Sequence, residues 1–579
     1  MEPTWKRVLW WIEIVVPLLV AIPFLFNWVV IDKTKPASQC LGITIITAVW
    51  WILEPVPIVV TAFIPILGLP LVGVSKGKDI ASSMFTDTSL VFLGGFIFSV
   101  AMVKWNLHSR IALKTVIIFG LRPRLLLLGI CLVTGFLSMW ISNTATALTM
   151  VPNALAIVAK LEEITGDPEM VAPFAKALFL GIAFSAGIGG MATLIGTPPN
   201  LIFAQTALKQ FPKSPAIGFS DFFFVAFPMS VLLMIIMYMY FVFVYMRKVK
   251  FPPNLDESVF RDNYDRLGPM SPAETVITTL FVSLALLWLF RADLNIGSLK
   301  IKGWSTLLHG TTGSSYILDG TVAMILSILL FFIHVPQPSE KKEQQNQKAT
   351  VDLELKKEET DKKYKAPLEL DSSDGMEEED NEIVLSKLTI DGEESMKWVP
   401  ILEWDYTEHK IPWSILFLFS GGFALNQGFI DSKLDKWIGE KLKSFTDLPL
   451  FVLILIITYI TSALSNVSSN TACANIVLPI VAALAQNAKK YHPWLLMLPA
   501  TFATSICFIL PIATPPNLIC LGSGRITTKD FLKSGTFINI VGVFLMSFCT
   551  MYLTDAVYDT EKFPTWANTS SLIQFPALN

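Results

Sequence analysis

Two copies of one polar triplet stand in apolar parts of the chain, Ser142-Asn143-Thr144 and Ser469-Asn470-Thr471. Each copy is followed by a second polar sequence, Thr197-Pro198-Pro199-Asn200 in the first half and Thr514-Pro515-Pro516-Asn517 in the second. Hydroxyl, carboxamide and main-chain oxygens suit an alkali cation, whereas amide N–H groups suit a carboxylate or a sulfate. Because the same order recurs, we expect the copies to form two halves of one binding site.

The spacing of the two copies supports a structural repeat. Gly94-Gly95 precedes the first triplet as Gly421-Gly422 precedes the second, and the distance from the first glycine to the triplet is the same in both halves. Such paired interruptions of apolar sequence are typical of secondary transporters built from repeats. Ser138 and Ser465 stand four residues before the triplets. We expect each of these hydroxyls to lie on one helix face with the triplet serine, one turn away.

The sequence around both motifs has no charged residue and no histidine, since none occurs in 125–159, 177–208, 448–488 or 494–524. A membrane site for a free cation usually supplies a carboxylate, and proton coupling usually requires a titratable group. A site for an anion alone usually supplies arginine or lysine. We therefore expect sodium ions to provide the positive charge that accompanies a bound anion. A neutral solute is the alternative.

The composition identifies the setting of these motifs as a membrane. The chain has 579 residues, of which 53% are hydrophobic and only 16% are charged, compared with about 25% charged residues in soluble proteins. We expect an all-α polytopic membrane protein. Segments 125–159 and 448–487 are expected to form re-entrant helical hairpins, with two ordinary spans each as the alternative. Eleven further segments are expected to span the membrane, the fifth and tenth as helices broken by prolines: 8–31, 39–55, 56–74, 89–104, 173–208, 221–246, 273–291, 319–335, 412–430, 494–522 and 530–553.

Lysine and arginine residues predict the orientation. Basic clusters follow the spans 89–104 and 221–246, so these loops are expected in the cytoplasm. The N-terminus is then cytoplasmic and the C-terminus extracellular, where Asn568 of Asn568-Thr569-Ser570 is a candidate glycosylation site. Four lysines between 433 and 443 fall on the predicted outside, and we interpret that segment as an interfacial helix. The charged loop 337–400 is expected to be solvated and mostly disordered.

Other function classes are disfavoured. The six cysteines are scattered through apolar sequence and suggest core positions rather than a disulfide framework. The five histidines are far apart, and no metal-spaced cluster, nucleophile elbow, phosphate-binding loop or dinucleotide fingerprint is present. No basic face suggests nucleic acid. We expect a protein that is not an enzyme.

At these motifs the chain resembles the divalent anion:sodium symporter family, the sodium-coupled di- and tricarboxylate and sulfate carriers. The resemblance rests on Trp105–Leu113, Leu137–Thr146, Gly189–Thr193 and Gly421–Leu425. It implies an inverted repeat of eleven spans with two re-entrant hairpins, an elevator-type movement and a homodimer in membrane lipid. It also implies a division into scaffold spans (1–104 and 221–336), a first transport half (105–220), a charged cytoplasmic loop (337–411), a scaffold span with an interfacial helix (412–446) and a second transport half (447–579).

The resemblance further implies the roles of individual residues. The first sodium site would use Ser138, Ser142, Asn143 and the backbone of Gly196, and the second would use Ser465, Ser468, Asn470 and the backbone of Ala513. Substrate carboxylates would contact Asn143, Thr144, Thr197, Asn470, Thr471 and Thr514. The expected function is sodium-coupled import of dicarboxylates such as succinate, malate or fumarate at a plasma membrane. The alternatives are a citrate or sulfate symporter, a sodium-independent exchanger, or a carboxylate sensor that does not transport.

Overall fold

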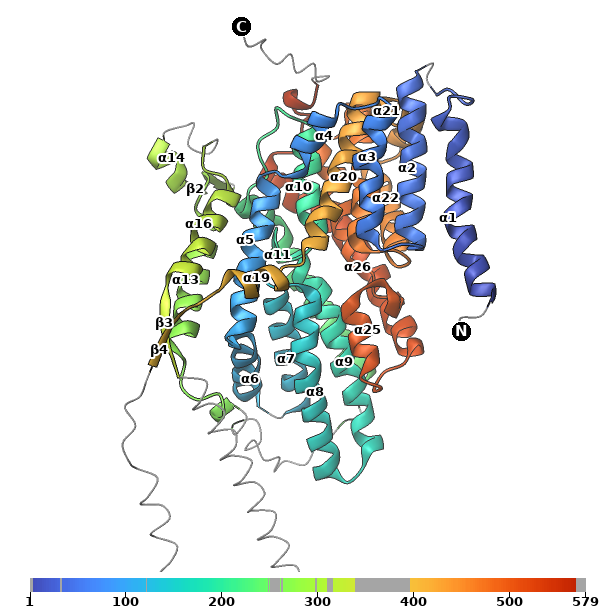
Figure 1. Ribbon diagram of the computed structural model, residues 1–579. Helices are drawn as coiled ribbons and strands as arrows, with labels where there is room; N and C mark the ends of the chain where they lie inside the picture. Colours follow the sequence, from blue (N-terminus) through green and yellow to red (C-terminus); the bar gives the residue numbers. More distant parts are fainter. Residues whose placement is uncertain are drawn as a thin grey trace, which may run out of the picture. The chain divides into compact units, whose positions relative to one another are not determined.

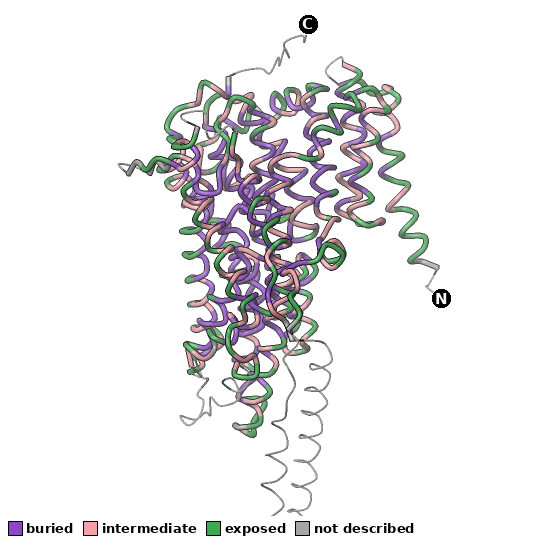
Figure 2. The backbone as a smooth tube through the Cα atoms, turned by 60° about the vertical axis from the view of Figure 1, so that its left-hand side comes forward, coloured by how far each residue is buried: buried purple, intermediate pink, exposed green. Residues whose placement is uncertain are grey.

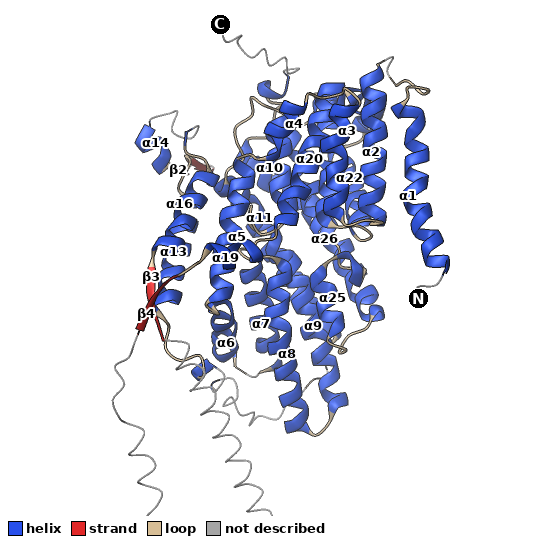
Figure 3. Cartoon of the chain, viewed as in Figure 1, coloured by secondary structure: helices blue, strands red, loops and turns tan. Residues whose placement is uncertain are grey.

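The computed structural model describes residues 4–31, 34–120, 122–247, 249, 261, 264–296, 299–309, 316–338 and 396–568. The chain separates into two compact units, a larger one (Met1–Ile328 and Thr407–Asn579) and a smaller one (Leu329–Tyr406). The larger unit is built almost entirely from helices (Figures 1 and 3). The expected helical membrane architecture is therefore confirmed.

The helices follow the apolar segments of the sequence. In the first half they are α1 (Thr4–Leu25), α2 (Lys35–Leu53), α3 (Ile58–Leu71), α4 (Gly77–Met84), α5 (Asp87–Lys104), α6 (Leu107–Phe119), α7 (Pro123–Ser138), α8 (Asn143–Thr165), α9 (Pro168–Met191), α10 (Pro198–Gln210), α11 (Phe219–Val244), α13 (Pro272–Leu289), α14 (Trp304–His309) and α16 (Asp319–Phe332). In the second half they are α19 (Trp404–Lys410), α20 (Trp413–Ser432), α21 (Leu434–Leu442), η2 (Lys443–Asp447), α22 (Leu450–Ser465), α23 (Asn470–Ala488), α24 (Pro493–Ser505), η3 (Pro511–Ala513), α25 (Pro515–Gly522), α26 (Thr528–Tyr558) and η4 (Thr565–Asn568).

Among the described residues, ten helical segments are long and apolar enough to cross a membrane. Four further apolar helices are shorter, namely α3, α7, α16 and α22. Each of the eleven expected spans coincides with one helix or with a broken pair of helices. The short helices α7 and α22 are the first arms of the two expected hairpins, and at 1.5 Å per residue each is about 24 Å long.

The polar triplets interrupt the hairpins at the expected places, but one local expectation is wrong. Ser138 and Ser142 do not share a helix, because α7 ends at Ser138 and Ser142 is the N-cap of α8. Its Oγ accepts a hydrogen bond from the backbone N–H of Ala145 at 3.2 Å. Ser469 caps α23 in the same way, and α22 ends at Ser465. Serine and asparagine bond nearby backbone groups and so favour a helix start over a helix interior.

The Thr-Pro-Pro-Asn sequences break two helices, as expected. Helix α9 ends at Met191 and α10 begins at Pro198, while α24 ends at Ser505 and α25 begins at Pro515. Each second helix starts with proline, whose fixed φ suits the first helical position and whose missing N–H is not needed there. The unwound segments therefore leave backbone groups available in the middle of each broken pair.

The first helices of the two broken pairs are deeply buried. The second part of α9 and all of α24 are buried, and Figure 2 shows buried residues concentrated inside the helical bundle. The helix at the marked N-terminus is instead largely exposed in this view. It carries exposed apolar side chains such as Trp11 and Leu19. An exposed apolar helix of this length is what a lipid environment requires.

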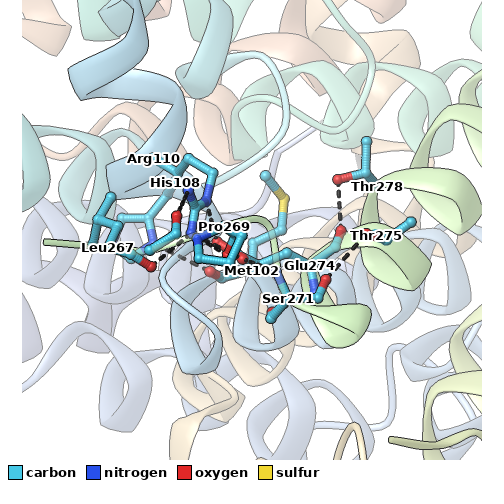
Figure 4. Close-up of polar contacts among 10 residues, drawn as sticks. Met102, His108, Arg110, Leu267, Pro269, Ser271, Glu274, Thr275 and Thr278 are labelled. Atoms are coloured by element: carbon cyan, nitrogen blue, oxygen red, sulfur yellow. Dashed lines mark hydrogen bonds and ion pairs between the residues drawn. The ribbon is translucent and has the colours of Figure 1, made fainter. Parts of the chain in front are cut away.

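Helix α6 is fixed to the start of α13 by Arg110 (Figure 4). The guanidinium lies with its Nε 2.6 Å from Glu274 Oε1 and donates further hydrogen bonds to the carbonyls of Leu267, Gly268 and Pro269. His108 donates from Nδ1 to the carbonyl of Met102 at 3.1 Å. Burial lowers the pKa of His108, so the ring is neutral at pH 7. The first turn of α6 is thus bonded to α5 through His108 and to α13 through Arg110.

Two short antiparallel ribbons add to the expected helical fold. Strands β1 (Leu294–Ile296) and β2 (Leu299–Ile301) pair in the larger unit, and β3 (His334–Pro338) and β4 (Met396–Pro400) pair in the smaller one. The expected disordered loop lies mostly outside the described residues, as do Thr569 and Ser570 of the predicted glycosylation sequence. The predicted interfacial segment at 433–443 does contain a helix, α21.

Candidate functional site

The two copies of the polar motifs meet at one cavity of about 260 Å³ in the larger unit. The turn between α7 and α8 and the start of α23 each contribute a triplet, and the two helix breaks contribute the Thr-Pro sequences. All six residues predicted to contact substrate line this cavity, namely Asn143, Thr144, Thr197, Asn470, Thr471 and Thr514. The geometry therefore brings the two halves of the predicted site together.

The predicted sodium ligands divide into two groups. Ser142, Asn143, Gly196, Asn470 and Ala513 line the cavity. The side chains of Ser138, Ser465 and Ser468 are buried, each in the same hairpin turn as its lining neighbours. Each hairpin thus has at least one buried serine hydroxyl beside the residues that line the cavity.

The hydroxyl of Ser138 has more acceptor neighbours than it can satisfy. Its Oγ lies 2.6 Å from Oδ1 of Asn143 and 2.7 Å from the carbonyl oxygen of Ala186. Both neighbours only accept hydrogen bonds, and the hydroxyl has one proton to donate. One of these two acceptor oxygens therefore faces Ser138 Oγ without a proton between them. A small cation bound among these oxygens would supply the missing positive charge.

The second hairpin repeats this arrangement and adds a thiol and a second buried hydroxyl. Ser465 Oγ lies 3.0 Å from Oδ1 of Asn470 and also contacts the carbonyl of Thr504. Cys507 Sγ donates to the same Asn470 oxygen at 3.1 Å. Ser468 Oγ is buried and has no hydrogen-bond partner in the described part of the chain. An unpartnered buried oxygen is costly unless a ligand completes it.

Close backbone approach shapes the first cluster. A Cβ atom built on Gly190 would lie 2.6 Å from Asn143 Oδ1, and one built on Gly196 would lie 2.5 Å from the Gly190 carbonyl oxygen. Neither position has room for a side chain. Because these glycines lack side chains, Gly190 packs against the carboxamide of Asn143 and Gly196 packs against the backbone of Gly190. The second half has Cys507 and Ala513 at the equivalent positions.

Sequence reasoning missed the role of the last residue of each Thr-Pro-Pro-Asn sequence. Asn200 Nδ2 donates to the carbonyls of Gly190 and Thr193, at 3.1 and 2.7 Å. Asn517 Nδ2 donates to the equivalent carbonyls of Cys507 and Leu510. These amides hold the unwound segments in shape. The recurrence of asparagine in both copies was the available signal.

The cavity has no charged side chain among the described residues that line it, but helix ends point toward it. Four helices start at the cavity, α8, α10, α23 and α25, so the positive ends of their dipoles point toward it. Helices α10 and α25 each begin with two prolines, which have no N–H to offer a ligand. Such a site favours an anion while its oxygen clusters favour cations.

The remaining walls are apolar, and the sequence did not reveal them. Helices α3, α5 and α20 contribute Ile58, Phe92, Phe96, Ile415 and Leu418. The one polar side chain that these three helices add to the described lining is Ser99 of α5. A ligand with polar ends and an apolar middle would match this distribution.

Comparison with known proteins supports this interpretation. The family model described as "Sodium:sulfate symporter transmembrane region" matches residues 8–555. The sodium-dependent dicarboxylate transporter SdcS of Staphylococcus saprophyticus is 32% identical over 525 residues, covering 89% of this chain and 86% of the relative. Solute carrier family 13 member 2 of Mus musculus is 33% identical over 610 residues, covering 96% and 95%.

A solved structure shares the fold at lower sequence similarity. MtrF of Neisseria gonorrhoeae, from a class of antimetabolite efflux pumps, superposes with a TM-score of 0.50 at 13% identity, covering 84% of each chain. This likeness concerns the arrangement of helices alone. The family match extends over nearly the whole chain and includes both halves of the cavity. The chain is therefore a member of the sodium:sulfate symporter family of membrane transporters.

Proposed function

We propose that the protein is a sodium-coupled symporter that imports dicarboxylates such as succinate, malate and fumarate. The observation that carries the proposal is an uncharged cavity at which four helix N-termini meet beside two oxygen clusters. In the first cluster Ser138 has more acceptor neighbours than protons, and in the second the buried Ser468 hydroxyl has no partner among the described residues. A dianion in such a cavity needs compensating charge, and the oxygen clusters are suited to supply it by holding sodium ions.

The two triplets favour a diacid as substrate. Asn143 and Thr144 line the cavity from one hairpin and Asn470 and Thr471 line it from the other, with apolar walls from Phe96 and Leu418. A dicarboxylate has two anionic ends and an apolar middle, whereas sulfate concentrates its charge at one centre. The name of the staphylococcal relative supports the same substrate class and sodium dependence.

Uptake into proteoliposomes tests this function directly. We expect labelled succinate to accumulate under an inward sodium gradient and to stop when choline replaces sodium. Equal uptake in choline would contradict sodium coupling and indicate an exchanger. Excess unlabelled succinate, citrate and sulfate, added separately, would then rank the substrates. Binding without any accumulation would instead support a sensor.

We infer the following assembly and orientation from the family resemblance and the charge pattern. The N-terminus lies in the cytoplasm and the C-terminus outside a plasma membrane, where Asn568 is a glycosylation acceptor. Two copies associate through scaffold spans, and the transport halves move as an elevator. In this orientation the first hairpin starts on the cytoplasmic side, after Arg122 and Arg124. Inverted repeats place the second hairpin on the opposite side.

A further inference from the structure

The equivalent residues Ser99 and Asn426 are in different environments. Each lies four residues after the second glycine of its Gly-Gly pair, Gly95 on α5 and Gly422 on α20. Ser99 lines the cavity. Asn426 is only 1% exposed, and neither its Oδ1 nor its Nδ2 has a hydrogen-bond partner among the described residues. A buried carboxamide with no partner at either atom is strongly unfavourable and requires an explanation.

The neighbouring glycines show why the two positions differ. A Cβ built on Gly422 would lie 1.9 Å from Oδ1 of Asn475, so α23 of the second hairpin packs directly on α20. A Cβ built on Gly95 would have one neighbour within 4 Å, Ile195 at 3.9 Å. Leu148, which occupies the position of Asn475 in the first hairpin, is 57% exposed. The second hairpin is therefore docked on its Gly-Gly helix, and the first is not.

A lysine strengthens the docked side. Lys209 at the end of α10 donates from Nζ to the main-chain carbonyl of Phe423 at 2.9 Å, directly after Gly422. The residue at the same place in the second half is Ile526, which cannot make the reciprocal contact with α5. The seam around Gly422, formed by Lys209, Phe423, Asn426 and Asn475, is thus closed and polar, while the equivalent seam around Gly95 is open to the cavity.

We propose that Asn426 is a residue of the substrate path that lines the cavity when it opens to the extracellular side, as Ser99 does when it opens to the cytoplasm. Inverted repeats allow each half to adopt the conformation of the other, and alternating access exchanges them around one site. Opening the Gly422 seam would expose Asn426 and give its amide atoms solvent or substrate partners. The carboxamide of Asn426 would then form its hydrogen bonds in the conformation with the open Gly422 seam, which differs from the conformation of this structure. The inference rests on the proposed transport function and adds a residue that the repeated motifs do not contain.

Cysteine accessibility tests the exchange. Ser99→Cys and Asn426→Cys form a matched pair in a background with Cys549→Ala, since Cys549 is the one partly exposed cysteine and the other five are buried. An impermeant maleimide is applied to intact cells and to inside-out vesicles. We expect Ser99→Cys to react from the cytoplasmic face and Asn426→Cys from the extracellular face. Changing sodium and succinate concentrations should alter the two labelling rates in opposite directions.

Labelling of both cysteines from the same face, or no labelling of Asn426→Cys in protein that still transports, would overturn the proposal. The substitution Asn426→Ser keeps a polar side chain, the one found at Ser99, and should retain uptake, whereas Asn426→Leu should favour the closed seam. For Asn426→Leu we expect about a tenfold lower maximal rate with an unchanged sodium KM. A changed KM with an unchanged rate would also contradict the proposal. Because labelling in sodium alone does not depend on the solute, it remains informative if wild-type protein takes up no dicarboxylate.

Discussion

The two halves of the cavity have almost the same chemistry but different packing. Gly94 and Gly421 have equivalent neighbours, since a Cβ on either would lie 2.6 Å from the Cβ of an alanine, Ala323 or Ala62. One residue later the symmetry ends, because Gly422 contacts Asn475 whereas Gly95 faces the cavity. The difference teaches that α5 and α20 are fixed alike to their own neighbours, and that asymmetry enters where the hairpins dock.

The two oxygen clusters differ most clearly in one proton donor. Ser138 and Ser465 each face a carboxamide oxygen and a carbonyl oxygen, so the two clusters share their main geometry. Ten residues before the last asparagine of each Thr-Pro-Pro-Asn sequence, the first half has Gly190 and the second has Cys507. The Cys507 thiol donates a hydrogen bond to Asn470. The second cluster therefore has an additional proton donor that must be displaced or tolerated when a cation binds.

The largest expected effect is loss of either triplet asparagine. Asn143→Ala and Asn470→Ala each remove a carboxamide that faces both an oxygen cluster and the cavity. We expect sodium-driven succinate uptake to fall to the background of empty vesicles while the protein still reaches the membrane. Asn153→Ala on α8 is the matched control, because Asn153 bonds only the Thr149 carbonyl of its own helix. Normal uptake by either triplet variant would show that the site is wrongly assigned.

Exchanging Gly190 and Cys507, which differ between the halves, sharpens the comparison of the clusters. Gly190→Cys should abolish uptake, because its Cβ would lie 2.6 Å from Asn143 Oδ1. Cys507→Gly removes the thiol donor from Asn470, and we expect the sodium KM to fall about three- to tenfold, the equivalent of one hydrogen bond. Sodium titration of initial uptake rates measures both. An unchanged KM in Cys507→Gly would mean that the thiol does not compete with the ion.

Asn200 and Asn517, the asparagine clamps that bond the carbonyls of the two unwound segments, are predicted to contribute equally to stability. Asn200→Ala and Asn517→Ala each remove two hydrogen bonds to main-chain carbonyls and leave those carbonyls buried. We expect each variant to lose about 1–3 kcal/mol of stability. Thermal unfolding of detergent-solubilised protein without substrate provides the measurement. A large loss in only one half would contradict the structural equivalence of the two breaks.

The smallest expected effect concerns the ends of the broken helices. Arg525, after α25, pairs with Glu162 of α8, and both side chains are partly exposed. Solvent screens such a pair, so Arg525→Gln should lower stability by only about 0–1 kcal/mol. In the first half, Gln210 donates to Asp435 and Gln486 without a salt bridge. The Arg525→Gln effect should shrink in high salt, and a salt-independent loss would point to packing instead.

The residues at the cavity could be predicted because they recur. Asn143 and Asn470 stand in charge-free apolar sequence, where a polar residue needs a reason, and the repeated prolines indicated the breaks at Pro198 and Pro515. The helix assignment of Ser142 failed because four-residue spacing is the same in a helix and across a helix cap. The apolar wall at Phe96 is indistinguishable from other membrane sequence until the fold places it.

The asymmetry between Ser99 and Asn426 could not be predicted for a different reason. The two sequences are equivalent, and only tertiary docking decides which hairpin closes on its Gly-Gly helix. A sequence repeat predicts the helices and breaks that the two halves share. It does not predict which hairpin is docked, because in the proposed cycle each half adopts the docked and the undocked conformation in turn.

The asparagine clamps have a consequence for the empty carrier. Asn200 and Asn517 satisfy the unwound backbone from within the protein, so the two breaks do not depend on cargo to keep their shape. A symporter has to reset after unloading, and a pocket that collapsed without its contents would have to be rebuilt in every cycle. Because these hydrogen bonds lie within the protein, the substrate-free site stays preorganised and can bind the next substrate without refolding.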